Sequence, residues 1–164
     1  MEPYADAPAW AAALEASRLG VLMRSSFVLY PIANLGHIFG LILFAGSVVV
    51  LDLRLLGLGR RGVDAAALSA ALTPVMLTGL ALMAITGTLL LSADARPLTT
   101  NPAFQAKAVL LALALANALL FRWLWTYLLP RWDEAAPGFA RIQVAVSLAL
   151  WLMVATAGRL IGYL

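Results

Sequence analysis

The side chain with the clearest capacity for chemistry is His37, the only histidine in the sequence. It lies in the stretch from Ile32 to Leu51, which carries no formal charge and is long enough for a helix to cross the ~30 Å apolar layer of a bilayer. A polar side chain in such a stretch is costly and usually faces a partner. His37 is therefore the predicted centre of a site.

Further residues are predicted to share the depth of His37. An antiparallel bundle brings the starts of the first and third apolar stretches, and the ends of the second and fourth, to one membrane face. Polar, small or sulfur-containing residues occur at each of these places. They are Asn34, Gly40, Met83, Thr86, Lys107 and Arg159. We expect them to form one layer around the histidine.

The predicted layer has the components of a haem b site. They are one imidazole, two cations and small residues inside a helix bundle that excludes water. His37 is the predicted iron ligand, and glycines such as Gly40 would admit the macrocycle. Lys107 and Arg159 would neutralise the two propionates. A sixth ligand, if there is one, is Met83 or the same histidine of a second copy. The expected function is electron transfer or haem-related redox chemistry.

Two other functions are open. His37 with Met76, Met83 and Met153 could bind copper, because thioether and imidazole ligands suit Cu(I), and a copper or proton transport module would follow. Alternatively, a neutral His37 is hydrogen-bonded to Asn34 or to a threonine and fixes helix packing. The protein is then a non-enzymatic structural or assembly subunit.

Two further features concern helix contacts. Gly36 and Gly40 have the GxxxG spacing that lets another helix approach closely, which predicts a packing face and a possible homo-oligomer through it. At the opposite membrane face, Asp52 and Arg122 reach similar depths and are predicted to form an ion pair, and the alternative role for Asp52 is that of a proton-relay carboxylate. Arg54 is then left for lipid head groups.

Membrane helices must position these residues. Hydrophobic residues make up 63% of the chain and charged residues 12%, about half the share in soluble domains. Four apolar stretches, at about 27–56, 67–92, 103–129 and 139–164, predict an all-α integral membrane protein. Short connections favour a four-helix up-and-down bundle over residues 27–164.

Residues 1–26 form a separate N-terminal segment. Within it, residues 8–25 have the pattern of an amphipathic helix lying in the interface, with Trp10 at head-group level and Glu15 on the polar face. Acidic residues in this segment argue against a cleavable signal peptide.

Charge and composition limit the partners. The basic residues are scattered, so we expect the lipid bilayer as the main partner and no nucleic acid. The absence of cysteine excludes thiol chemistry. Five arginines flank one predicted membrane face and three the other, which favours both termini outside the cytoplasm. The arginine-, alanine- and leucine-rich composition is typical of a GC-rich bacterial coding sequence, so we expect a multi-pass protein of a bacterial inner membrane.

Two segments carry a family resemblance. The runs ANLGHIFGLILFAGSVVVLDLRLLG and NPAFQAKAVLLALALAN resemble a family of uncharacterised small bacterial membrane proteins, the DUF6644 type. More distantly, they are similar to the superfamily of HemJ-type protoporphyrinogen IX oxidases and CopD-like copper-resistance proteins.

The HemJ-type pattern has a first-helix histidine, then small and aromatic residues, then an arginine-leucine exit, and a lysine opening a later helix. His37, the region 39–46, Arg54 and Lys107 follow that order. The resemblance implies haem b on His37, a role for Lys107, and oxidation of a porphyrinogen or a related electron transfer. Asn117 stands where HemJ-type proteins usually carry a further histidine.

Overall fold

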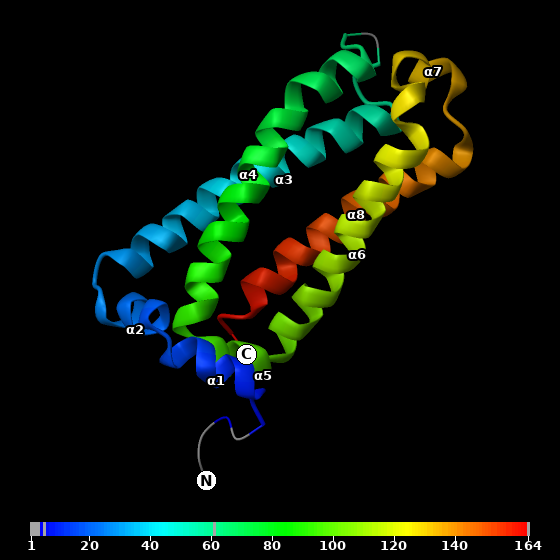
Figure 1. Ribbon diagram of the computed structural model, residues 1–164. Helices are drawn as coiled ribbons and strands as arrows, with labels where there is room; N and C mark the ends of the chain where they lie inside the picture. The colour runs from blue at the N-terminus through cyan, green and yellow to red at the C-terminus, as the bar shows by residue number, and fades with distance from the viewer. Residues whose placement is uncertain (1–3, 5, 61, 164) are drawn as a thin grey trace.

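Four long apolar helices form the body of the protein. The computed structural model describes residues 4, 6–60 and 62–163, and all the regular structure in these residues is helical. The long helices are α3 (Leu29–Leu56), α4 (Ala65–Ala93), α6 (Pro102–Trp125) and α8 (Gly138–Leu160). By length and composition, all four are able to cross a membrane. The predicted all-α, multi-pass architecture is confirmed (Figure 1).

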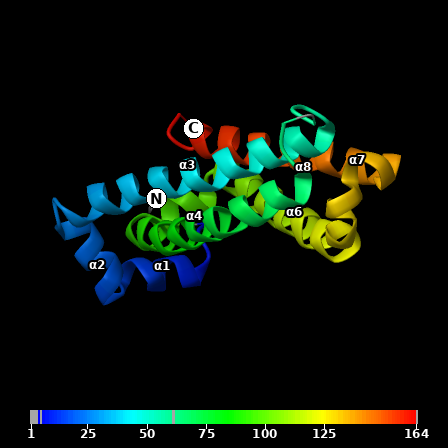
Figure 2. The ribbon, with the colours of Figure 1, turned by 90° about the horizontal axis from the view of Figure 1, so that it is seen from above.

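The bundle is built from two helix pairs. α3 packs along α4, α6 packs along α8, and the pairs meet mainly where α3 contacts α8 (Figures 1 and 2). There the rings of Phe44 and Trp151 meet edge to face, with their centroids 4.5 Å apart. α4 and α6 do not pack closely against each other. The side of the bundle between these two helices is therefore the less tightly closed one.

Local signals set several helix ends. Gly57 ends α3 with a left-handed φ of 113°, a conformation that glycine adopts without steric cost. The Asp64 carboxylate caps α4 by accepting from the Ala67 N–H at 2.8 Å. The Asn101 side chain caps α6 just before Pro102, whose missing N–H is harmless at this position.

The connections contain more helix than expected. The loop between the second and third spans includes α5 (Ala95–Thr100). The helix expected over 103–129 ends as α6 at Trp125 and continues as the 3-10 helix η1 (Thr126–Arg131) and the short α7 (Trp132–Ala135). η1 contains Pro130, which cannot donate the hydrogen bond that an α-helix requires.

The N-terminal segment forms two helices where one was expected. α1 (Ala9–Ala16) and α2 (Arg18–Ser25) are separated by Ser17, which is extended and whose hydroxyl caps α2 by accepting from the Gly20 N–H. Both helices lie at the same end of the bundle, where α1 packs against α5 and α2 packs against α4 (Figure 1). Trp10 is exposed, as expected for a head-group contact. Glu15 is buried against Arg96 rather than solvated, which corrects its predicted orientation.

Candidate functional site

His37 lies half-buried between α3 and α4. Its Nδ1 atom is 3.0 Å from the Thr86 hydroxyl oxygen. That hydroxyl donates its single hydrogen to the Leu82 carbonyl at 2.6 Å. Nδ1 must therefore carry the hydrogen and donate to Thr86, which leaves the lone pair of the neutral ring on Nε2.

Lys107 comes close to this histidine from the other helix pair. Its side chain extends over Gly158 of α8, where a Cβ would lie 3.3 Å from Nζ. The lysine is near enough for its charge to act on His37. The structure thus joins His37 and Thr86 by a hydrogen bond, whereas Lys107 packs on Gly158 and makes no hydrogen bond to either residue in the described part of the chain.

Two other members of the predicted layer point elsewhere. The Arg159 guanidinium donates to the Tyr163 hydroxyl at 2.6 Å and lies 4.8 Å from the centre of the Tyr163 ring. Asn34 lies on the exposed side of α3. Neither residue is directed towards His37.

The glycines beside His37 face a helix. A Cβ on Gly36 would lie 3.0 Å from Thr86 Cγ2, and one on Gly40 would lie 2.8 Å from Met83 Cγ. α4 of the same chain therefore fills both the space that the sequence assigned to a macrocycle and the predicted homo-oligomer face. Nε2 of His37 suits an iron ligand, but the Gly36 and Gly40 face has no room for a macrocycle.

The copper ligands of the alternative prediction are not assembled. Met83 packs on Gly40, Met76 lines a cavity near the other end of the bundle, and Met153 is exposed on α8. Within the described residues, no three His, Asp or Glu side chains are grouped as a metal site. The bundle interior offers no copper site of the predicted composition.

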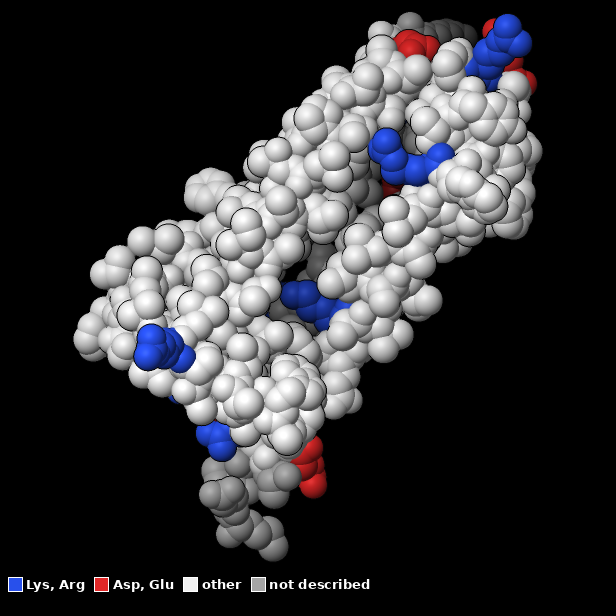
Figure 3. Space-filling model, in the orientation of Figure 1, with Lys and Arg blue, Asp and Glu red and all other residues white. Residues whose placement is uncertain are grey.

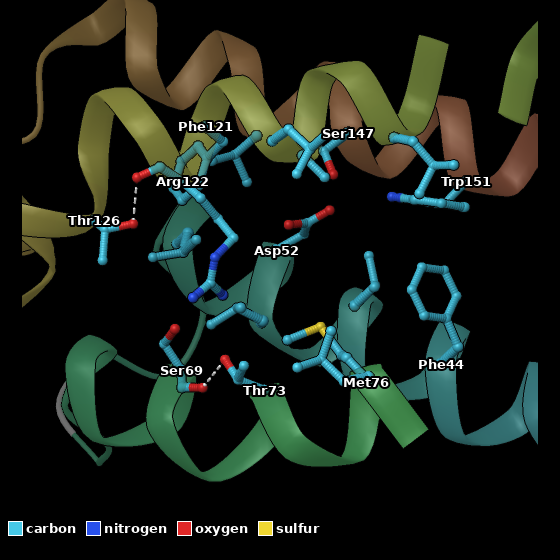
Figure 4. Close-up of a pocket in the computed structure, with 18 of the residues that line it drawn as sticks. Phe44, Asp52, Ser69, Thr73, Met76, Phe121, Arg122, Thr126, Ser147 and Trp151 are labelled. Carbon is cyan, nitrogen blue, oxygen red and sulfur yellow. Dashed lines mark hydrogen bonds between the residues drawn. The ribbon is translucent and has the colours of Figure 1, made fainter. Parts of the chain in front are cut away.

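The cavity lined by Met76 lies between the long helices. It has a volume of about 210 Å³, is lined by residues of all four long helices, and lies where α4 and α6 diverge. Its walls are mostly apolar, with Phe44 and Trp151 at the inner end (Figure 4). Figure 3 shows this face of the protein hollowed between the two helices, with basic side chains set in the hollow.

Asp52 of α3 points into this cavity (Figure 4). The residue is 6% exposed, and its Oδ2 atom has no hydrogen-bond partner among the described residues. Ser147 of α8 lies beside the same carboxyl group. A buried carboxylate oxygen without a donor is costly, which marks this atom as one that a bound molecule could satisfy.

Arg122 of α6 reaches into the same cavity from its exposed side (Figure 4). The predicted ion pair with Asp52 is wrong, since no N to O distance of 4.0 Å or less between them is found in the described chain. The expectation for Arg54 is also wrong. This residue is 4% exposed and donates to both oxygens of Asp133, at 3.0 and 2.6 Å.

Hydroxyl groups surround the mouth of the cavity. Ser69 and Thr73 lie on α4, and Thr126 begins η1 (Figure 4). These residues and Arg122 also line an adjoining, more open cavity of about 480 Å³ between α4 and η1. The two cavities together form an apolar chamber with a polar entrance, which we call the Asp52 pocket.

The sequence pointed to Asp52 and Arg122 but not to this pocket. Ser69, Thr73 and Ser147 are single hydroxyl residues in apolar helices, where such residues commonly bond only to their own backbone. Their convergence depends on how the four helices are rotated. The depth comparison that placed Asp52 opposite Arg122 was the one available signal.

Comparison with known proteins gives one match. A family model described as "Family of unknown function (DUF6644)" matches residues 10–164. No curated protein and no solved structure matches the chain.

Proposed function

This chain belongs to the DUF6644 family, whose function is unknown, and from that premise we propose that it is a membrane-embedded binding protein for a lipid-like molecule. The observation that carries the proposal is the Asp52 pocket. It is a chamber formed by four apolar helices that contains one carboxyl group and one guanidinium group and lies where α4 and α6 diverge. Largely apolar pockets with a few polar groups are typical ligand sites.

The lining of the pocket changes from polar to apolar with depth, as a lipid leaflet does from its head groups to its acyl chains. Asp52 lies one turn before the end of α3, and Arg122 lies in the last turn of α6. Phe44 is eight residues earlier on α3, or roughly 12 Å nearer the middle of the bilayer at 1.5 Å per residue. A molecule with a polar end at the helix termini and an apolar chain towards the middle matches this gradient.

Photo-crosslinking tests the proposal. Purified full-length protein in mixed micelles is irradiated with phospholipids carrying a diazirine on one acyl chain, using ethanolamine, choline and glycerol head groups. We expect at least one lipid to label residues of the Asp52 pocket. Ala118→Trp, which fills the pocket, should reduce this labelling severalfold, whereas Leu120→Trp on the exposed side of α6 should leave it unchanged.

Labelling confined to the outer surfaces of the helices, and insensitive to Ala118→Trp, would refute the proposal. Circular dichroism and gel filtration of both variants establish that the comparison is between folded proteins.

His37 supports a second candidate function, ligation of haem b for electron transfer. Its Nδ1–H donates to Thr86, a partner of the kind that orients metal-ligating histidines, and Nε2 keeps its lone pair. The order of His37, Arg54 and Lys107, which resembles the HemJ-type pattern, would favour the same function. Because α4 fills the glycine face, a haem would have to lie outside the bundle or between two copies.

Absorption spectra test the second candidate. Protein expressed with adequate haem supply should show a Soret band, with α and β bands after reduction by dithionite. His37→Ala should abolish these bands, and Thr86→Val should shift or weaken them. A colourless and folded wild-type protein would remove this candidate and favour a structural role for His37.

The proposed location is the bacterial inner membrane, with both termini outside the cytoplasm. More arginines flank the end of the bundle at α7 than the end at α5. The Asp52 pocket, which lies towards the α7 end, then faces the cytoplasmic leaflet. A homo-oligomer would have to use a surface other than Gly36 and Gly40, which α4 covers.

A further inference from the structure

The chemistry of the Asp52 pocket specifies the polar end of its ligand, an inference that rests on the proposed function. Asp52 Oδ2 is buried, points into the pocket, and has no donor among the described residues. The pocket therefore lacks a hydrogen-bond donor at one defined position. A bound molecule that supplies this donor removes the cost of leaving the oxygen unsatisfied.

Two of the three hydroxyls at the entrance, those of Thr73 and Thr126, can accept from a ligand but not donate to it. The Thr73 hydroxyl donates to the Ser69 carbonyl at 2.6 Å, and the Thr126 hydroxyl donates to the Arg122 carbonyl at 2.6 Å. Each hydroxyl has one hydrogen, so both oxygens can act towards a ligand as acceptors only. Together with Asp52 they give the pocket three acceptor groups that face a ligand.

Arg122 contributes hydrogen-bond donors and a positive charge to the pocket. Its guanidinium group is a fixed cation with several donors, and it lies at the entrance rather than against Asp52. A ligand with a cationic donor towards Asp52 and an anion towards Arg122 would satisfy both residues at once. A glycerol head group can donate a hydroxyl to Asp52, but it brings an anion and no cation to the pocket.

We infer that the Asp52 pocket binds a zwitterionic phospholipid whose head group carries a primary ammonium, as in the ethanolamine class. The ammonium donates to Asp52 and to the threonine oxygens, and the phosphate accepts from Arg122. The acyl chain runs between α4 and α6 towards Phe44. A choline head group has the same charges but no N–H, so the pocket distinguishes the two by hydrogen bonding.

Competition between lipids tests this inference on the full-length protein in detergent. Labelling by the diazirine ethanolamine lipid is challenged with unlabelled ethanolamine, choline and glycerol phospholipids of identical chains. We expect ethanolamine lipid to compete about tenfold better than choline lipid, because hydrogen bonds to a charged group are strong. Asp52→Asn should reduce this preference to less than threefold, and Arg122→Gln should weaken both zwitterionic lipids alike.

The outcomes separate this inference from the proposed function. The head-group assignment is overturned if ethanolamine and choline lipids compete equally, or if the preference for ethanolamine survives Asp52→Asn. In either case, labelling of the pocket would still support lipid binding. Absence of pocket labelling by every lipid refutes the proposed function itself. Soluble phosphorylethanolamine is the last competitor tested. If phosphorylethanolamine competes as strongly as the diacyl lipid, the site binds a free metabolite, and the inference that its ligand is a phospholipid is overturned.

Discussion

Among single residues, Glu15 shows how a surface helix is held to the bundle. Its two carboxylate oxygens accept from the backbone N–H and the Nε–H of Arg96, each at 2.7 Å. Burial raises the pKa of Glu15, but the hydrogen bonds from Arg96 and the positive charges of Arg96 and Arg24 outweigh it and hold the pKa below its usual value. The ionised form is therefore the one that stabilises the fold.

This pKa predicts a pH dependence of stability. Because the folded pKa of Glu15 is lowered, its contribution is present above its unfolded pKa and is lost as the pH falls through the lowered value. Thermal unfolding in detergent at neutral pH should show Glu15→Gln destabilised by about 1–3 kcal/mol. The difference from wild type should shrink below pH 4. A constant difference at all pH values would contradict the role of the charge.

The ion pair of Arg54 and Asp133 predicts a large effect from a loop residue. Asp133→Ala leaves the buried Arg54 guanidinium without its carboxylate. Since Asp133 is itself 38% exposed, we expect a loss of about 2 kcal/mol rather than the 3–5 of a fully buried pair. Arg60→Ala is the control, because Arg60 is 41% exposed, lies 3.5 Å from the same carboxylate and should cost under about 1 kcal/mol.

Unfolding midpoints in the same detergent measure both variants. Similar losses for Asp133→Ala and Arg60→Ala would show that Arg54 finds another partner.

At the scale of elements, the contact between α3 and α4 depends on Gly79. A Cβ on this residue would lie 2.6 Å from the Phe44 backbone nitrogen and 2.8 Å from the Gly40 carbonyl oxygen. Both atoms belong to helical backbone and cannot move aside without separating the helices. The α3 and α4 pair is therefore held at a distance that only glycine permits at this position.

Two glycine substitutions test this contact. Gly79→Ala should destabilise the protein by about 1–3 kcal/mol, because the added methyl group overpacks the interface. Gly46→Ala is the matched control on α3, since a Cβ there has no neighbour within 4 Å, and its effect should be under about 1 kcal/mol. Equal effects in thermal unfolding would refute the close contact of the two helices.

At the scale of the whole molecule, the arrangement predicts which loops face the cytoplasm. The chain has no cysteine, so a single introduced thiol reports on one position without background. Phe27 is 98% exposed between α2 and α3, and Leu58 is 60% exposed beyond the other end of α3. The arginine distribution predicts that Leu58 lies on the cytoplasmic side.

Labelling with a membrane-impermeant maleimide measures this orientation. Phe27→Cys should react in intact cells, and Leu58→Cys should react after permeabilisation only. The reverse pattern would invert the protein and place the Asp52 pocket in the outer leaflet.

The sequence by itself determined the number of membrane spans and several helix ends. Length and apolarity of a span are local properties, and so are the cap at Asn101 with Pro102 and the left-handed Gly57. The sequence also singled out His37, Lys107 and Thr86, because ionisable and polar residues are rare in apolar stretches.

Tertiary structure alone decided what these residues contact. The rotation of each helix turned Gly40 towards α4, buried Glu15 and kept Asp52 apart from Arg122. In lipid, an apolar helix has no water-facing side to fix its rotation, so hydropathy does not reveal which face packs. The pairing of α3 with α4 and of α6 with α8, and the pocket where α4 and α6 diverge, follow from close packing between residues distant in the chain. Sequence spacing does not record those contacts.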